Sequence, residues 1–319
     1  MNRTDSLWAI DRAFLDGILL RADGRDLMAD APSADVEAMY AARDAGSRTG
    51  TVAVLAITGP LTKRDSLMSV LFGGTSYSRI VAQLHMLAAD ETVASILLNI
   101  DSPGGQVAGA GEAAAAVRHA ASIKPVTALA NTTMASAAAW LGWSASEVIA
   151  TPDAIVGSQG VFALHVDTSK ALEMMGIRPT YIASSDAKVG GQDGLPLDDA
   201  TRAEMQAIVD EANRQFVADA AAGRGITPAQ VRESYGNGAV FTARDAKKRG
   251  MVDRVETFSQ AAARLSGTKS PWAMAAAATD DPQMFADAVV EAIVDAVMNG
   301  TGVSPNRLLL DADAWRFGS

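Results

Sequence analysis

Residues 96–107 read ILLNIDSPGGQV, an apolar run that stops at a proline and two glycines. The run predicts a buried strand over 94–100, and the Ser-Pro-Gly-Gly sequence at 102–105 marks the turn that ends it. We expect Gly104 and Gly105 to open an alanine-rich helix over 107–121. Paired glycines at a helix start leave backbone N–H groups open to a phosphate or an oxyanion.

This turn does not carry the signature of a nucleotide-binding loop. No Gly-Lys-Ser or Gly-Lys-Thr follows it, and Gly104, Gly105 and Gly109 lack the G-x-G-x-x-G spacing. Taken alone, a Ser-Pro-Gly-Gly turn is more often structural than functional, so its meaning depends on the rest of the chain.

Strand and helix patterns alternate on both sides of this stretch. The sequence predicts strands over 51–57, 125–130, 147–150, 160–166 and 180–183, and helices over 76–89, from about 134, and over 199–222. This alternation is typical of βαβ units, so we expect an α/β fold with a mostly parallel sheet.

Composition divides the chain into three parts. We expect an N-terminal arm over 1–49, in which Leu7–Ile10 begins a roughly helical apolar spacing. We expect the main domain, large enough for a catalytic domain, over 50–265. We expect residues 266–319 to form a linker and a helical extension, because the sequence of 283–298 would place one apolar stripe on an acidic helix. Such a helix needs a partner, which is either another copy or the domain itself.

The overall composition excludes several classes of protein. The 319 residues include no cysteine, which excludes a disulfide scaffold, a thiolate nucleophile and a cysteine-bound metal. A net charge of −10 argues against direct binding of nucleic acid. No apolar stretch reaches the length of a signal peptide core or a membrane span, so we expect a soluble cytoplasmic protein.

A second candidate site is Ser136, which alanines flank where strand 125–130 gives way to a helix. Small neighbours allow a substrate backbone to reach the hydroxyl, although a tolerated serine in a tightly packed helix explains the same pattern. A nucleophilic serine needs a base. His85 and His119 fall in helix patterns, and His165 alone follows Ser136, with no spacing typical of a triad.

Lysine is the other possible base, since a buried lysine becomes neutral more easily. The chain has seven lysines, and Lys188 differs from the rest because its immediate neighbours in SSDAKVGG (184–191) are small or apolar. For a lysine taken at random, solvent exposure remains the ordinary expectation.

Six segments in order resemble the S49 peptidase family, the group of signal peptide peptidase A and the phage head-maturation proteases. The segments are TVAVLAITGPL (51–61), ILLNIDSPGGQV (96–107), MASAAAWLG (134–142), IVGSQGV (155–161), SSDAKVGG (184–191) and GAVFTARDAKKRGMVD (238–253). The resemblance covers about residues 50–260 and implies a ClpP/crotonase-type fold.

The resemblance also implies roles for particular residues. Ser136 would be the nucleophile and Lys188 its general base, with oxyanion N–H groups from Gly105 and Ala137. Gly104 would shape the turn, and Ser158 would be a weaker candidate for contact with the substrate strand. Alanines follow Ser136 where bacterial members commonly have glycines, and their Cβ atoms would narrow the pocket.

The family implies a serine endopeptidase without metal or organic cofactor, active as a homo-oligomer whose subunits complete one another's clefts. Membrane-associated members carry a hydrophobic anchor, and no such segment is visible in this sequence. The resemblance therefore favours the phage branch, with scaffold or portal-associated protein as substrate. Alternatives are a host peptidase of the signal-peptide-peptidase type, a Ser-His-Asp peptidase that uses His165, a crotonase-type acyl-CoA enzyme, and a structural assembly protein with a degenerate site.

Overall fold

The structure is a computed structural model that describes residues 7–10, 48–49, 52–65 and 73–267. Its strands are β1 (Leu7–Ile10), β2 (Arg48–Thr49), β3 (Val52–Thr58), β4 (Leu61–Thr62), β5 (Thr75–Ser76), β6 (Ser95–Ser102), β7 (Gly104–Gln106), β8 (Val126–Ala135), β9 (Glu147–Ala150), β10 (Ile155–Gly157), β11 (Phe162–Ala163), β12 (Val240–Thr242) and β13 (Arg254–Val255). Its helices are α4 (Tyr77–Ala89), α5 (Ala110–Ile123), α6 (Ala137–Gly142), α7 (Ser169–Met174), α8 (Asp186–Val189), α9 (Asp199–Arg224), α10 (Pro228–Ser234), α11 (Ala243–Lys248) and α12 (Phe258–Ser266).

The main sheet is parallel at its centre, as the alternating pattern predicts. Its strand order is β12-β10-β8-β6-β3-β2, and β9 pairs with the first half of β8 while β10 pairs with the second half. Most residues of the central strands β3, β6 and β8 are buried, because helices cover both faces of a parallel sheet. The α/β expectation is therefore confirmed.

A second, smaller sheet lies next to the main sheet and is formed largely by continuations of its strands. Its order is β11-β1-β7-β4-β5. Three of its strands continue strands of the main sheet after a short turn: β4 follows β3, β7 follows β6, and β11 follows β10. Strand β8 has no such continuation, because the chain leaves the sheet at Ser136 and enters α6.

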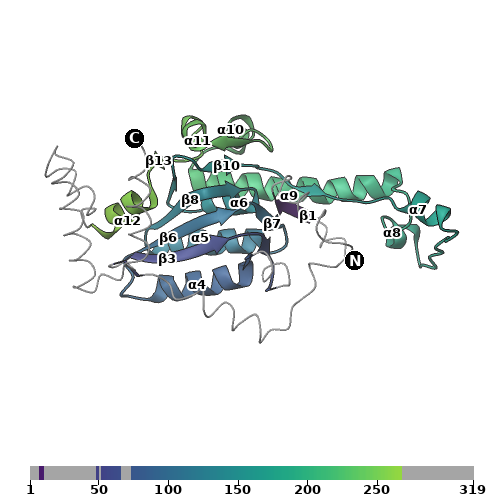
Figure 1. The fold of residues 1–319 in the computed structure, drawn as a ribbon, viewed down its shortest axis with the longest axis horizontal. Helices are drawn as coiled ribbons and strands as arrows, with labels where there is room; N and C mark the ends of the chain where they lie inside the picture. The colour runs from purple at the N-terminus through teal and green to yellow at the C-terminus, as the bar shows by residue number, and fades with distance from the viewer. Residues whose placement is uncertain (1–6, 11–47, 50–51, 66–72, 268–319) are drawn as a thin grey trace, which may run out of the picture.

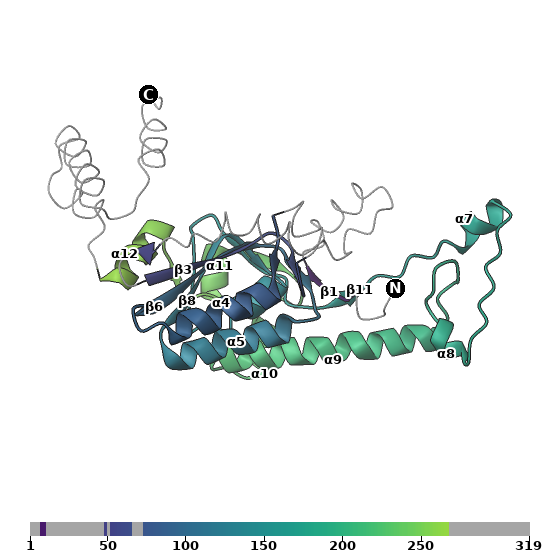
Figure 2. The ribbon, with the colours of Figure 1, turned by 90° about the horizontal axis from the view of Figure 1, so that it is seen from below.

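Helices α4, α5 and α6 cover one face of the main sheet, and α12 packs on the other (Figures 1 and 2). The first face holds the larger core, in which Trp140 of α6 stacks on Phe216 of α9 with ring centroids 4.6 Å apart. The smaller core on the second face joins Leu97, Leu129 and Ala261. Burial of these apolar surfaces on both sides of the sheet holds the domain together.

Residues 164–212 form a projecting segment that comprises α7, α8 and the outer half of α9 (Figure 2). Within it, Gly194 and Thr201 are the buried residues. Large apolar side chains are exposed along its length: Leu164, Val166, Met174, Met175, Ile177, Tyr181, Ile182 and Ile208. The inner half of α9 returns to the core through Phe216, Val217, Ala220 and Ala221.

Three local expectations are wrong. Leu7–Ile10 is a strand and not the start of a helix, because it pairs with strands on both sides. Residues 180–183 form no strand, since they lie exposed in the projecting segment without a neighbouring strand. Gly104 and Gly105 do not open a helix: they belong to β7, and the helix begins at Ala110 after Gly109, whose φ of 97° suits glycine.

Other expectations fall outside the described residues. These include the helix expected over 283–298, the rest of the C-terminal extension beyond 267, and most of the N-terminal arm. Among the described helices, none combines the length and apolar character that a membrane span requires.

The end of α9 is tied to the amino end of the main sheet by an ion pair between Arg224 and Asp253. Asp253 also accepts the backbone N–H of Val148, at 2.8 Å. Burial opposes ionisation of Asp253, but the hydrogen bonds from Arg224 and Val148 outweigh it and hold the pKa of this carboxyl below its ordinary value. The ionised form is therefore the one that stabilises the fold.

We expect Asp253→Asn to lower the free energy of unfolding at pH 7 by roughly 1–3 kcal/mol, since it leaves the buried Arg224 without its counter-charge. A depressed carboxyl pKa contributes stability above the unfolded value of about 3.9, so the difference from wild type shrinks as the pH falls below it. Urea unfolding between pH 3 and pH 7 measures this. Asp245→Asn, which breaks an exposed pair with Lys248, is the control and has little effect. If the difference in unfolding free energy between Asp253→Asn and wild type does not change with pH, the ionised form of Asp253 is not the one that stabilises the fold.

Candidate active site

Ser136 lies where β8 ends and α6 begins, as the sequence predicts, and it is 1% exposed. Its backbone has φ of 55° and ψ of −121°, a conformation that residues with a Cβ rarely adopt. The N–H of Ser136 donates to the carbonyl of Gly157 at 2.8 Å. A strained backbone that the surrounding hydrogen bonds enforce is typical of functional sites.

The turn that holds Ser136 is built from small residues. Ala137, Ala138 and Ala139 are fully buried, and a Cβ on Gly142 would lie 2.3 Å from the sulfur of Met134. The first intrahelical bond joins the N–H of Trp140 to the carbonyl of Ser136, so the N–H of Ala137 belongs to the unbonded first turn of the helix. That N–H is therefore available to an oxygen bound beside Ser136.

Strand β7 is held rigidly beside the end of β8. Ser102, which is fully buried, donates to the carbonyl of Gly59 at 2.6 Å and accepts the N–H of Gly104 at 3.2 Å. At the other end, the hydroxyl of Tyr77 donates to the carbonyl of Gln106 at 2.8 Å. Burial raises the pKa of this hydroxyl well above its ordinary value, so it stays protonated. Ser102 thus supports the Gly-Gly segment.

Each glycine of β7 has its own structural reason. Gly104 has φ of 96°, which strongly favours glycine. A Cβ on Gly105 would lie 1.8 Å from the carbonyl oxygen of Leu61, so β4 approaches β7 more closely than any side chain permits. Both glycines are therefore required by the backbone, whatever further role their N–H groups have.

A bulge in β8 brings Ser136 to this position. Ile100 pairs with Ala130 and Ser102 with Met134, so three residues of β8 lie against Asp101 alone. Thr132 in the bulge has φ of 102°. Burial raises the pKa of Asp101, and the backbone N–H of Thr133, which donates to its carboxyl, opposes that shift. The carboxyl of Asp101 thus stabilises the irregular backbone of the bulge, just before Ser136.

Ser158 lies one residue beyond Gly157, in a turn with φ of 55°. Its N–H donates to the carbonyl of Ala239 at 2.7 Å, which fixes β10 to the segment before β12. The carbonyl of Gly157 keeps its contact with Ser136 for this reason. Ser158 lies beside the turn that holds Ser136, and a contact with substrate stays a prediction.

Gln159, which no local sequence pattern marks as a site residue, is fully buried in the same turn. Its amide nitrogen donates to Asn213 of α9 at 2.7 Å, and its carbonyl oxygen has no partner among the described residues. Trp140 likewise donates to Asp219 of α9 at 2.9 Å. The inner half of α9 therefore supports both turns around Ser136, a role that no local sequence pattern signals.

The structure does not bring the candidate bases to Ser136 within one chain. Lys188 is exposed in α8, at the outer end of α9 (Figures 1 and 2). A Cβ on Gly191 would lie 3.5 Å from Thr201 and 4.0 Å from His165, so His165 also belongs to the outer part of this helix. Thr201 and Asn213 lie twelve positions apart in α9, or about 18 Å along the helix axis.

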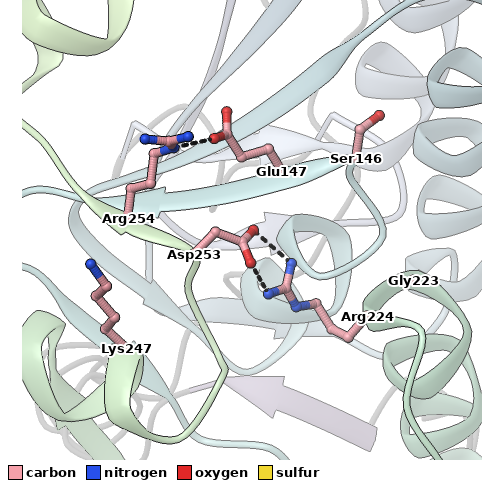
Figure 3. Close-up of a pocket in the computed structure, with 7 residues that line it drawn as sticks. All are labelled: Ser146, Glu147, Gly223, Arg224, Lys247, Asp253 and Arg254. Atoms are coloured by element: carbon pink, nitrogen blue, oxygen red, sulfur yellow. Dashed lines mark hydrogen bonds and ion pairs between the residues drawn. The ribbon is translucent and has the colours of Figure 1, made fainter.

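A pocket of about 570 Å³ lies elsewhere, at the amino end of the sheet (Figure 3). Its lining residues are Ser146, Glu147, Gly223, Arg224, Lys247, Asp253 and Arg254. Arg224 pairs with Asp253, and Arg254 with Glu147. In the sheet register Glu147 lies opposite Thr127 near the start of β8, nine positions before Ser136 and on the far side of the bulge. The charges of this pocket join structural elements and do not reach Ser136.

Comparisons with known proteins agree with this geometry. Residues 118–270 match the model described as peptidase family S49, and residues 58–156 match the Clp protease model. Over residues 118–270 the chain is thus similar to peptidase family S49, and its main domain has the Clp-type α/β fold. The family and fold expectations are therefore confirmed.

The similar proteins include two from phages. The chain is 34% identical over 210 residues to the Capsid assembly protease C of Escherichia phage lambda, and 36% identical over 210 residues to the Head-tail preconnector protein GP5 of Enterobacteria phage P21. Each match covers 66% of this chain, but 47% and 42% of those proteins. Protease 4 of Salmonella typhi is 27% identical over 71% of this chain and 36% of its own length.

The strained backbone at Ser136 predicts a difference in stability between two substitutions at this position. Glycine tolerates φ of 55° without a Cβ clash, so Ser136→Gly is expected to be about 1 kcal/mol more stable than Ser136→Ala, despite its greater freedom when unfolded. The two variants both lack the hydroxyl, which makes them a matched pair. Denaturant unfolding at neutral pH gives the difference. A lower stability for Ser136→Gly than for Ser136→Ala would show that the backbone here is unstrained.

Proposed function

We propose that this chain is a serine endopeptidase in which Ser136 is the nucleophile and Lys188 the general base. The observation that carries the proposal is the strained turn at Ser136, which opens the helix that contacts the Gly-Gly strand β7 and leaves the N–H of Ala137 outside the intrahelical bonds. A serine fixed by its backbone, with N–H donors at hand, suits acyl transfer. The match of residues 118–270 to the S49 peptidase model adds to this support.

The proposed reaction follows from these positions. Neutral Lys188 takes the proton of Ser136 while its oxygen attacks the carbonyl carbon of the scissile peptide. The N–H groups of Gly105 and Ala137 donate to the resulting oxyanion, and loss of one such donor typically lowers the rate about 10²–10³-fold. Lys188 then passes the proton to the leaving amine. Water, deprotonated by the same lysine, releases the acyl group from Ser136.

Because Lys188 lies at the outer end of the projecting segment, we propose that the dyad forms between two copies of the chain. The projecting segment carries its apolar side chains outward, with Ile182 98% exposed and Met174 89% exposed. Exposed apolar patches of this kind mark surfaces that bind protein. Contact with a neighbouring copy would also bury the amine, which favours its neutral form.

We further propose that the chain acts in phage head assembly, on scaffold or portal-associated protein in the host cytoplasm. The names of the two phage relatives support this setting. A host peptidase of the signal-peptide-peptidase type is the second candidate, because Protease 4 of Salmonella typhi is also similar. Cleavage of a phage capsid scaffold protein, with the Ser136→Ala chain as control, separates the two.

The shared dyad predicts complementation. We expect Ser136→Ala and Lys188→Ala each to lower the cleavage rate of an unfolded protein substrate by at least roughly 10³-fold. Mixed together under conditions that exchange subunits, the two inactive chains regain part of the activity, since some sites receive Ser136 from one chain and Lys188 from another. Initial rates of the mixture and of each variant alone measure this. Two variants that never restore activity would place both residues in one chain.

The projecting segment predicts a link between assembly and activity. We expect Ile182→Glu to shift the protein to smaller assemblies and to lower activity in parallel, because a charge opposes burial of this position. Light scattering after size-exclusion chromatography reports the assembly, and the same cleavage assay reports activity. Met86→Glu is the control, because Met86 is 68% exposed on α4, outside the projecting segment. Equal effects of the two substitutions argue against the assigned surface.

A further inference from the structure

Strand β1 is the one strand of the smaller sheet that comes from the N-terminal part of the chain. It runs antiparallel to β7, with Trp8 opposite Gln106, Ala9 opposite Gly105 and Ile10 opposite Gly104. On its other side it runs antiparallel to β11, with Leu7 opposite Ala163 and Trp8 opposite Phe162. The backbone of Leu7–Ile10 thus lies directly along the Gly-Gly segment of the candidate active site (Figure 1).

The position of β1 follows from the topology of the two sheets. In the main sheet β8 lies between β6 and β10. In the smaller sheet β7 continues β6 and β11 continues β10, but β8 turns away into α6 at Ser136. A space one strand wide therefore remains between β7 and β11, in front of the point where Ser136 leaves the sheet. Strand β1 fills this space.

The space recognises backbone and not a particular sequence. Neighbouring strands lie about 4.8 Å apart, so β7 and β11 are separated by about 9.6 Å and admit a single extended chain. Each of them turns unpaired N–H and C=O groups toward that chain when β1 is absent. An extended polypeptide substrate gains the same hydrogen bonds by adding itself as a strand, with its backbone beside Gly105 and Ser136.

We propose that Leu7–Ile10 occupies, within its own chain, the strand position that a polypeptide substrate must take, and that substrate has to displace it. This inference rests on the proposed peptidase function. Leu7–Ile10 and the substrate bind in mutually exclusive ways, so the segment acts as a competitive inhibitor that is covalently attached. Removing its pairing lowers KM and leaves kcat unchanged.

Trp8 offers a matched pair of variants, because it lies opposite both neighbouring strands. Trp8→Pro removes a backbone N–H from the middle of β1, whereas Trp8→Ala removes the same side chain and keeps the N–H. The lost hydrogen bond, together with the disturbed ladder, predicts a KM about tenfold lower for Trp8→Pro than for Trp8→Ala, at equal kcat. Deletion of residues 1–10 gives the same decrease or a larger one.

A binding experiment tests the occupancy without relying on catalysis. In chains that also carry Ser136→Ala, a fluorescent peptide of residues 4–12 is titrated and its polarisation recorded. We expect the chain lacking residues 1–10 to bind this peptide, the Trp8→Pro chain to bind it about as well, and the Trp8→Ala chain to bind it about tenfold more weakly. A peptide with proline at the position of Trp8 is the control and binds none of them.

The outcomes separate the two proposals. Equal KM values and equal peptide affinities across the Trp8 variants would overturn the competition by β1. If no chain cleaves substrate but the peptide still distinguishes the variants, the strand position stands and the peptidase function fails. If cleavage depends on Ser136 but neither Trp8→Pro nor the deletion changes KM, the peptidase function stands and the inhibitory strand fails. Circular dichroism of each variant confirms that it is folded.

Discussion

The departure of β8 from the sheet at Ser136 is the constraint on which the rest of the active-site region depends. One residue with φ of 55° turns the chain from the sheet into α6, and the carbonyl of Gly157 holds that turn through the N–H of Ser136. The same departure leaves β7 and β11 without a strand between them, apart from β1. A single backbone conformation thus positions the proposed nucleophile and creates the space for an extended chain beside it.

Helix α9 connects this region to the projecting segment. Its inner half supports the turns around Ser136 through Asn213, Phe216 and Asp219, while its outer half leads to α8 and Lys188. A 26-residue helix is about 39 Å long, so the two halves act in different surroundings. In the proposed assembly, contact between copies both buries the apolar outer surface and delivers the base, which makes activity dependent on assembly.

Local sequence signals predicted the regular elements well because those signals are physical causes. Buried strands need continuous apolar runs, as in the segment that became β6, and the helix of 199–222 shows the expected spacing over α9. The failures have equally physical reasons. Leu7–Ile10 forms a strand because its backbone pairs with β7 and β11, which lie far from it in the sequence. Residues 180–183 are irregular because no neighbouring strand lies beside them.

The sequence by itself determined the α/β class, the resemblance to S49 peptidases, and the place of Ser136 at a strand-to-helix junction, since each depends on residue type and on short spacings. The tertiary structure alone decided that Lys188 and Ser136 lie apart within one chain, that Gln159 reaches Asn213, and that Leu7–Ile10 lies along Gly104–Gln106. These relations join residues far apart in the chain, and no local pattern encodes them. They arise because backbone N–H and C=O groups at a sheet edge bind whichever strand the fold brings to them.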